Sequence, residues 1–525
     1  MIKHFNTAWP STADLHYLLD PLGRIDLPNI LSLIEQRRYF VLHAPRQTGK
    51  TTCLLALRDA LNHDGQYVAV YANIEGAQAL RQDMQAAMQT IASVLGEKLE
   101  SALQLPGLRT ALMAEAQGAG AGDSLRSLLR IATLKSSKPI VLFLDEVDAL
   151  VGDTLISLLR QIRAGYTDRP EAFPQTIVLC GVRDVRDYRM TLADGEVITG
   201  GSAFNIKAES LRLGDFSEAD IAELYQQHTD ATGQAFSHDA LALAWQLTRG
   251  QPWLVNALAE QAVWKTAANL ERTQTIDEPR LRAAGEALIL RNDTHLDQLT
   301  DKLREPRVRA VIEPMLLGLQ VDQAIADLQY VYDLGLIRLD AYQNPVPANA
   351  IYAEVLPRVL NSSAQFGLHS ERIRPDWQNP NGSLNPHQLL RNFLEFWKKD
   401  GEPMMATISY HDAAPHLVVM AYLQRVVNGR GRIEREYAAG SGRLDLLVVF
   451  GAQHMAIEVK VWRHKRSDPL HDGLEQIERY LTRLSLDEGF LVLFDQRSAA
   501  PDWPLRMSVS QARTASGLGV TVLRG

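Results

Sequence analysis

Charged side chains interrupt the two apolar runs of a stretch near the end of the chain, GRLDLLVVFGAQHMAIEVKVW at residues 442–462, and three of them could do chemistry together. They are Asp445, Glu458 and Lys460, and such charges are costly in a strand unless they are paired or bind an ion. Two carboxylates that converge on one point repel each other unless a positive group lies between them. Mg²⁺ or Mn²⁺ suits such oxygen ligands and can activate a water beside a scissile phosphate, while Lys460 can orient that water. We therefore predict a metal site in which Asp445 and Glu458 are ligands and all three residues are catalytic.

This convergence depends on how the two apolar segments pair. If residues 443–450 and 455–461 form an antiparallel hairpin closed by the four-residue turn 451–454, Asp445 lies opposite Lys460. Side chains alternate between the two faces of a strand, so Glu458 then shares a face with both. A slip of one residue would separate the three groups. The competing interpretation is a half-exposed strand that turns these charges toward solvent.

A second set of residues has the spacing of a phosphate-binding loop, APRQTGKT at residues 44–51. The backbone N–H groups of such a loop wrap phosphates at the N-terminus of the following helix, where the helix dipole favours anions. Gly49 allows close approach, Lys50 reaches the terminal phosphates, and the Thr51 hydroxyl ligates Mg²⁺. Ala44 replaces the first glycine of the pattern, which is tolerable if that residue needs no positive φ. The predicted nucleotide-binding residues in this segment are Pro45, Arg46, Gln47, Thr48, Gly49, Lys50, Thr51 and Thr52.

Two adjacent acidic residues could supply the metal ligand and the base that hydrolysis of a bound nucleotide needs. An apolar run ends in Asp145 and Glu146, about 95 residues after the loop. In this arrangement Asp145 holds Mg²⁺ and Glu146 polarises the attacking water. The alternative is that both acids merely cap a helix that follows the strand. The loop upstream favours the nucleotide interpretation.

The elements that position these residues alternate between strand and helix. Short apolar runs occur at residues 38–43, 67–72, 139–150 and 175–182, with helical stretches between them. This order predicts a parallel sheet covered by helices on both faces, which is an α/β fold. From Ser217, which precedes an acidic first turn, the pattern becomes helical.

The rest of the chain divides at changes of pattern and composition. A helix followed by a small hairpin predicts a winged-helix module, and a stretch rich in Asn, Ser, Pro and Gly predicts a linker. The predicted parts are a core with its lead segment (1–215), a helical lid (216–290), a winged-helix module (291–360), a linker (361–387) and a C-terminal α/β domain (388–525).

Residues 38–260 resemble AAA+-related ATPases of the branch that contains the archaeal-type and STAND ATPases. The residues that carry this resemblance are the loop, the two acids and Arg249-Gly-Gln-Pro252-Trp253, which is similar to the G-x-P motif of a helical lid. The resemblance implies ATP and Mg²⁺ as cofactors, Pro252 against the adenine, and a homo-oligomer. The family has a polar sensor residue after the strand that here ends in Gly181-Val182-Arg183. Arg183 is either that sensor, an arginine finger or an ordinary surface residue.

The last part resembles the RecB-like branch of the PD-(D/E)xK nucleases over residues 385–525. Asp445 and Glu458-Val-Lys460 match the superfamily motif, and Gln476 with Tyr480 matches the Q-x-x-x-Y motif of the branch. The resemblance implies a restriction-endonuclease-like fold, an α-β-β-β-α-β core, and a role for Gln476 in catalysis on nucleic acid, with DNA preferred over RNA. The helix expected at 416–427 offers no further acid.

The distribution of charge limits where a nucleic-acid partner could bind. The 525 residues carry 54 basic and 62 acidic side chains, a net charge of −8. From residue 391 onward 18 basic and 16 acidic side chains give +2, so a nucleic-acid contact belongs at the C-terminal end. Basic residues there surround Trp462, although interleaved acids also fit a mixed-charge surface. These basic residues are Arg425, Arg430, Arg432, Arg435, Arg443, Arg463, Lys465 and Arg466.

Composition also indicates the compartment. The chain has two cysteines, Cys53 and Cys180, no targeting peptide at its start and no apolar run that could span a bilayer. We therefore expect a cytoplasmic protein without a membrane partner.

The leading hypothesis is an ATPase whose nucleotide state controls a metal-dependent DNA-cleaving domain, in defence against foreign DNA by family analogy. The alternative is a nucleotide-switched signalling scaffold, or a remodelling ATPase, whose C-terminal domain binds without cutting.

Overall fold

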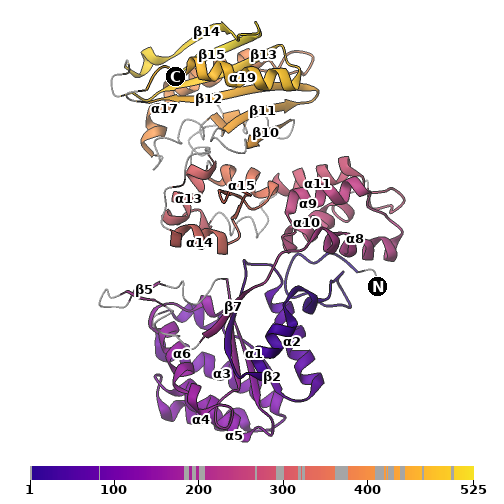
Figure 1. The fold of residues 1–525 in the computed structure, drawn as a ribbon, viewed down its shortest axis with the longest axis vertical. Coiled ribbons are helices and arrows are strands. Elements are labelled where there is room, and N and C mark those ends of the chain that lie inside the picture. The colour runs from indigo at the N-terminus through magenta and orange to yellow at the C-terminus, as the bar shows by residue number, and fades with distance from the viewer. Residues whose placement is uncertain are drawn as a thin grey trace. The chain divides into compact units, whose positions relative to one another are not determined.

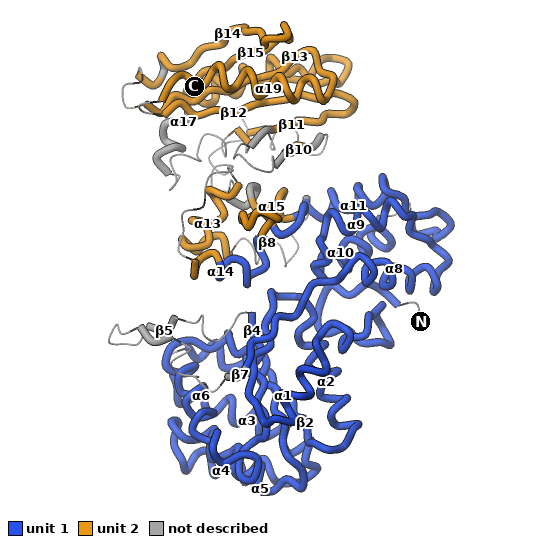
Figure 2. Tube along the Cα trace, in the orientation of Figure 1, with its two compact units in different colours: residues 1–295, 329–338, 348–351 blue, residues 296–328, 339–347, 352–525 orange. Residues whose placement is uncertain are grey.

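The computed structural model describes most of the chain in two compact units, which are treated separately (Figure 2). Unit 1 comprises residues 1–295, 329–338 and 348–351, and unit 2 comprises residues 296–328, 339–347 and 352–525. Within these units the described residues are 3–81, 83–182, 189–191, 197–199, 207–266, 269–290, 301–316, 321, 325–360, 377–407, 419–420, 422–423, 431–437, 444–463, 466–497, 500 and 502–525.

Unit 1 is built on a five-stranded parallel sheet with the order β2-β3-β4-β1-β7 (Figure 1). Every residue of β1, β3 and β4 is buried, as expected for parallel strands covered on both faces. The predicted parallel α/β sheet is therefore confirmed, and the carboxyl ends of its strands share one edge. The strands are β1 (Tyr39–His43), β2 (Val68–Asn73), β3 (Ile140–Asp145), β4 (Thr176–Gly181) and β7 (Lys207–Arg212).

Helices cover the two faces of this sheet with different apolar clusters. Helices α1 and α2 pack on one face, and helices α3 to α6 pack on the other. The helices are α1 (Leu27–Glu35), α2 (Lys50–Asp64), α3 (Met84–Leu103), α4 (Leu108–Ala119), α5 (Ser124–Lys135) and α6 (Gly152–Ala164). Short 3₁₀ turns and a small ribbon complete the region: η1 (Pro21–Arg24), η2 (Glu75–Leu80), η3 (Val147–Ala149), η4 (Tyr166–Asp168), β5 (Arg189–Thr191) and β6 (Val197–Thr199).

Four helices follow the sheet, as the change of pattern at Ser217 predicts. Ser217 caps the first of them in a capping box with Asp220, so the predicted helix start is confirmed. The N-terminal segment packs into this helical layer through Phe5 and Tyr17, and the Tyr17 hydroxyl lies 3.2 Å from Nδ1 of His228. The helices are α8 (Glu218–Thr232), α9 (His238–Thr248), α10 (Pro252–Val263) and α11 (Glu278–Leu290).

A set of short elements separates this layer from the C-terminal sheet along the chain. Two of its strands pair with each other in a two-stranded sheet. Helix followed by hairpin is the predicted order, while the assignment as a winged helix stays a prediction. The elements are α13 (Pro306–Leu316), α14 (Ile325–Asp333), β8 (Ile337–Leu339), β9 (Pro345–Pro347) and α15 (Ala350–Leu360).

The C-terminal part of unit 2 is a six-stranded mixed sheet with the order β10-β11-β12-β13-β15-β14. Strand β12 runs parallel to β13, and the connection between them is helix α19. Residues of α17 pack on one face of this sheet and residues of α19 on the other. The elements are α17 (Pro386–Thr407), β10 (Gly431–Tyr437), β11 (Leu444–Phe450), β12 (Gln453–Trp462), α19 (Leu470–Leu484), β13 (Glu488–Asp495), η9 (Trp503–Arg506), β14 (Ser508–Arg513) and β15 (Gly519–Arg524).

The register of the β11–β12 hairpin differs from the prediction by two residues. Phe450 pairs with Gln453 across a two-residue turn, rather than across the four-residue turn expected at 451–454. Gly451 adopts φ +59°, the conformation that tight hairpin turns favour, so the next residues join the strand. Continued by one residue, the observed register sets position 445 opposite Glu458 instead of Lys460. A shift of two preserves the alternation of faces, so position 445 stays on the predicted face of the sheet.

Several sequence-based expectations fall outside the described residues. Positions 183, 425, 430, 443 and 465 are among them, as are the side chains at positions 432, 435 and 445. Of the helix expected at 416–427, only residues 419–420 and 422–423 are described, and they are helical. The five-part division of the chain stays a prediction. Both cysteines are buried and free, as expected for core positions. None of the helices in the described ranges is both long and apolar enough to cross a membrane.

Replacing Gly250 with alanine tests the link between the sheet and the helical layer. Gly250 has φ +79°, its carbonyl accepts a hydrogen bond from the Phe216 N–H, and an added Cβ would lie 1.8 Å from the Phe216 carbonyl oxygen. Gly250→Ala should destabilise the fold by about 3 kcal/mol through strain and overlap. Gly233→Ala is the matched control because its φ is +77° with no atom near the added Cβ, and it should cost only about 1 kcal/mol. Equal shifts of the two thermal unfolding midpoints would contradict this account.

Candidate functional site

The loop between β1 and α2 has the backbone that a phosphate site needs. Gly49 adopts φ +88° at the N-cap of α2, and an added Cβ there would lie 2.8 Å from Nη1 of Arg24. Ala44 does not adopt a positive φ, so its replacement of the usual glycine causes no strain. Arg24 donates to the Thr48 carbonyl at 2.6 Å and to the Gly214 carbonyl at 2.6 Å. These bonds tie the loop to the segment that follows β7.

Lys50 lies across this loop. Its Nζ donates to the carbonyl oxygens of Ala44 and Pro45, each at 3.0 Å, and its side chain is buried. Thr48 also donates its hydroxyl to the Pro45 carbonyl at 2.8 Å. The ammonium group therefore lies where the loop's N–H groups and the helix dipole attract an anion, as the sequence predicts.

Asp145 meets Thr51 at the carboxyl edge of the sheet. The Thr51 hydroxyl donates to Asp145 Oδ2 at 2.7 Å, and the Tyr71 hydroxyl donates to the same oxygen at 2.8 Å. The Glu146 N–H donates to the other oxygen, Oδ1, at 2.9 Å. The sequence spacing predicted the approach of Thr51 and Asp145. It did not predict Tyr71, although β2, which carries it, is the neighbour of β3.

Glu146 follows at the start of η3 in a left-handed conformation, φ +59°. Burial raises the pKa of its carboxyl, the nearby Asp148 raises it further, and Lys50 acts in the opposite direction. Asp148 Oδ1 accepts a hydrogen bond from the Val182 N–H at 3.3 Å, at the end of β4. Residues from three strand ends thus gather beside the loop. Because its pKa is raised, the Glu146 carboxylate binds protons more readily and is suited to accept one from water.

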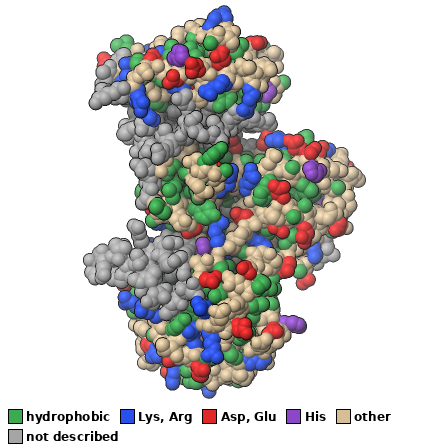
Figure 3. Space-filling model, viewed as in Figure 1, with side chains coloured by type: hydrophobic (Ala, Val, Ile, Leu, Met, Phe, Trp, Pro, Cys, Tyr) green, Lys and Arg blue, Asp and Glu red, His purple; other side chains and the backbone are tan. Residues whose placement is uncertain are grey.

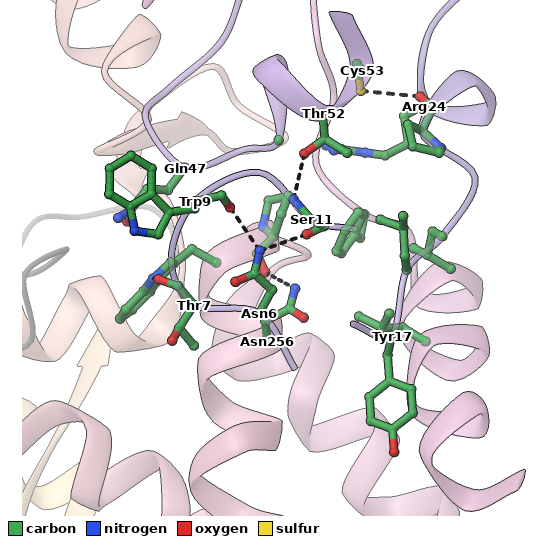
Figure 4. A pocket seen from close by; sticks show the side chains of 18 of the residues that line it. Asn6, Thr7, Trp9, Ser11, Tyr17, Arg24, Gln47, Thr52, Cys53 and Asn256 are labelled. Atoms are coloured by element: carbon green, nitrogen blue, oxygen red, sulfur yellow. Dashed lines mark hydrogen bonds between the residues drawn. The ribbon is translucent and has the colours of Figure 1, made fainter. Parts of the chain in front are cut away.

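A cavity adjoins this loop in unit 1 (Figure 4). One wall is the N-terminal segment, where the Ser11 N–H donates to the Thr52 hydroxyl at 3.2 Å. Another wall is the start of α10, where Pro252 is the first residue and Trp253 donates Nε1–H to the Thr7 carbonyl at 2.8 Å. Pro252 therefore lines the cavity beside the phosphate loop, together with Gln47 and Gly49 from the loop. Among the predicted loop residues, Arg46 is exposed and does not line the cavity.

A second cluster lies in the C-terminal sheet. Lys460 Nζ donates to Glu458 Oε1 and to Gln476 Oε1, and the latter comes from α19. The exposed fractions are 1% for Glu458 and 6% each for Lys460 and Gln476. The other oxygen of Glu458, Oε2, is buried and has no hydrogen-bond partner in the described part of the chain. These charges are therefore buried beneath α19, and the alternative of an outward-facing strand is wrong.

The structure brings together three of the four residues predicted for this second site. The fourth, Asp445, lies in β11, where strand alternation places its position on the face of Leu447, which packs against the α19 cluster. Its side chain is outside the described residues. For the residues whose side chains are described, no three His, Cys, Asp or Glu side chains form a group that could hold a metal.

Two arginines outside the predicted basic set lie against Trp462. The guanidinium carbons of Arg497 and Arg524 lie 3.3 and 5.7 Å from the centroid of the Trp462 ring. Each arginine is also paired with an acid, Arg497 with Asp495 at 2.6 Å and Arg524 with Asp468 at 2.7 Å. Figure 3 shows both signs of charge on the visible face of this unit. Of the eight basic residues predicted around Trp462, only Arg463 and Arg466 have described side chains, so the basic patch and the mixed-charge surface both stay predictions.

A comparison with known protein families gives a match over the region that contains the phosphate loop. Residues 34–188 match the AAA domain family. Solved structures similar to this chain include a Walker-type ATPase of Pyrococcus abyssi (TM-score 0.44, 14% identity, 67% of this chain and 99% of the other) and Cdc6p of Pyrobaculum aerophilum (0.38, 13%, 68% and 97%). The RuvB Holliday junction branch migration motor of Thermotoga maritima is another (0.32, 13%, 63% and 95%). No curated protein matches the chain. Residues 34–188 thus match an AAA-type ATPase domain, and the P-loop fold of such domains implies a nucleotide, usually with Mg²⁺.

Replacing Lys50 with alanine tests the phosphate site directly. Lys50→Ala removes a charged donor from the loop, so the affinity for ATP should fall about 100-fold, measured by calorimetry. Arg58→Ala is the control, because Arg58 belongs to the same helix but pairs with Asp59 at 2.7 Å. Its affinity for ATP should match that of the unmodified protein. An unchanged affinity in Lys50→Ala would exclude this loop as the phosphate site.

Proposed function

We propose that this protein binds and hydrolyses ATP, and that its nucleotide state controls a C-terminal domain that cleaves DNA with a divalent metal ion. The observation that carries the second half is the buried cluster of Glu458, Lys460 and Gln476 with one carboxylate oxygen left open. A homo-oligomer and a role in defence against foreign DNA belong to the same proposal and rest on family resemblance.

The residues of the ATPase site fit Mg²⁺ and a triphosphate. Thr51 and Asp145 offer two hard oxygen ligands that already lie 2.7 Å apart. When bound there, Mg²⁺ would neutralise charge on the phosphates. Lys50 would exchange its two carbonyl partners for phosphate oxygens, and Glu146 would orient a water and accept its proton. Tyr71 would keep Asp145 in place, because burial and Asp145 raise the pKa of its hydroxyl, which remains a donor.

The C-terminal cluster also fits a cation. A buried ion pair is weak evidence of stability, because desolvation of both charges offsets their attraction. The buried Oε2 of Glu458 lacks a donor among the described residues, and the hairpin register, continued by one residue, would set position 445 opposite Glu458. Glu458 and Asp445 would hold Mg²⁺ or Mn²⁺, which would supply an activated water and charge stabilisation at a scissile phosphate. Lys460, held by Gln476, would then donate to the phosphate or to the water.

One observation favours a second candidate function. Lys460 already neutralises one oxygen of Glu458, so the cluster can persist as an internal ion pair without a metal. In that case the C-terminal domain would bind nucleic acid or a protein partner without cutting, and the protein would act as a nucleotide-switched scaffold. Metal-dependent cleavage separates the two candidates.

Replacing Glu146 with glutamine tests its role as the base. Glu146→Gln keeps the size of the side chain and removes its ability to accept a proton. Hydrolysis of ATP should fall at least about 100-fold, while ATP binding should stay within about threefold of the original. Glu75→Gln is the control, because Glu75 is an exposed acid just beyond the end of β2, at the same edge of the sheet. Normal turnover in Glu146→Gln would remove Glu146 from the reaction.

Cleavage assays test the C-terminal site. Supercoiled, linear and single-stranded DNA would be incubated with Mg²⁺ or Mn²⁺, with and without ATP. Glu458→Gln and Lys460→Ala should each reduce cleavage at least about 100-fold, because they remove a ligand and a cationic donor. Glu475→Gln should cleave normally, since Glu475 is exposed on the same helix as Gln476.

The outcome that contradicts the nuclease is specific. If no DNA substrate is cut while ATP is still hydrolysed, the scaffold is the better account. If Glu458→Gln and Lys460→Ala cut as well as the unmodified protein, the activity lies elsewhere. Circular dichroism of each variant would show that its fold is intact.

A further inference from the structure

Two residues at the cavity of unit 1 have a backbone conformation that side chains rarely adopt. Trp9 has φ +62° and Gln47 has φ +58°, and both line the same cavity (Figure 4). Neither is a glycine, so each conformation costs free energy that the surrounding structure must offset. Strained non-glycine residues gather at ligand sites more often than elsewhere. The pair therefore points to a ligand rather than to packing.

Trp9 is held in place although it is almost fully exposed. Its side chain is 92% exposed, which is unusual for so large an apolar group. Asn6 fixes the turn that carries it, because Asn6 Nδ2 donates to the Trp9 carbonyl at 2.9 Å and to the Ser11 hydroxyl at 3.0 Å. The Ser11 N–H in turn donates to Thr52 in the first turn of α2. The indole is thus presented from a turn that is anchored to the phosphate-loop helix.

Gln47 contributes an unused polar atom to the same cavity. Its Oε1 is buried and accepts no hydrogen bond from the residues that the structure describes. A buried acceptor without a partner is costly unless a ligand supplies the donor. Gln47 stands two residues before Gly49 in the loop, so its amide lies beside the phosphate site.

The position of the cavity decides which ligand is favoured. A triphosphate on the loop must extend its nucleoside away from Lys50, and the cavity next to Gly49 and Thr52 offers the space. Nucleosides combine a flat aromatic base with N–H and O–H donors. A Trp face and an unpaired amide oxygen complement these two features.

We propose that Trp9 and Gln47 determine the nucleoside specificity of this site. Trp9 stacks on the base, and Gln47 Oε1 accepts a hydrogen bond from either the 6-amino group of the base or a ribose hydroxyl. This inference rests on the proposed nucleotide site and states which residues of that site distinguish one nucleoside from another. It assigns the exposed tryptophan a ligand contact rather than a contact with another protein.

Binding by calorimetry on the full chain tests the role of Trp9. Trp9→Ala should weaken ATP about tenfold and leave inorganic tripolyphosphate unchanged, while Trp9→Phe keeps most of the affinity for ATP. Tyr342→Ala is the control, because Tyr342 is an aromatic residue that is 74% exposed and does not line the cavity. An unchanged ATP affinity in Trp9→Ala, with or without a change of oligomeric state, would overturn the stacking role.

A second variant tests Gln47 separately. Gln47→Gly permits the left-handed backbone and removes the whole side chain with its amide, so ATP affinity should fall about fivefold. The unmodified protein should prefer ATP over either ITP, which lacks the 6-amino group, or 2′-deoxy-ATP, and the variant should lose that preference. Equal losses for ATP and tripolyphosphate would overturn the proposal, since Gln47 would then act on the phosphates. If the unmodified protein binds neither ATP nor tripolyphosphate, the nucleotide site itself fails and the proposal fails with it.

Discussion

The hydrogen bond between Thr51 and Asp145 is the constraint on which the ATPase region depends. Asp145 is the last residue of β3, whereas Thr51 lies in the first turn of α2, the helix that follows β1. Strands β1 and β3 are not neighbours, because β4 lies between them. The two side chains can meet only if all three strands are parallel, end at the same level and leave room above β4. Strand β4 meets these conditions, since it is fully buried and ends in Cys180 and Gly181, which have small side chains or none. The order of the strands therefore allows the Thr51 hydroxyl to reach the Asp145 carboxylate. The Tyr71 hydroxyl, from β2, donates to the same oxygen.

The sequence allowed the strands and the loop of this site to be predicted because their signals are local. Apolar runs of five or six residues, a glycine before Lys50 and two acids after a strand are each visible within a short window. Tyr71 and Asp148 could not be assigned in the same way, since their roles depend on which strands become neighbours. The N-terminal segment shows the same limit. This segment packs against His228 and bonds to Thr52, and both contacts join residues far apart in the chain. The periodicity of the sequence does not predict such contacts.

The C-terminal hairpin shows where local reasoning fails. The letters GAQH are compatible with a four-residue turn and with a two-residue turn followed by two strand residues, and only the φ of Gly451 decides between them. Glu458 and Lys460 still share the predicted face, and position 445 keeps its parity, because an error of two residues leaves the alternation unchanged. Their burial was not predictable from the strand. It arises because the parallel connection from β12 to β13 lays α19 over that face, and Gln476 then reaches Lys460.

Both sites share one electrostatic feature that follows from burial. In each, a lysine is satisfied internally, Lys50 by two carbonyl oxygens and Lys460 by a carboxylate and an amide. An ammonium group left without partners in these positions would carry a large desolvation cost, which the internal bonds offset. A phosphate ligand then exchanges one set of hydrogen bonds for another of similar kind, and the net gain comes from its extra charge. Ligand binding can therefore proceed through changes of side-chain partners, while the buried strands that position the lysines remain where they are.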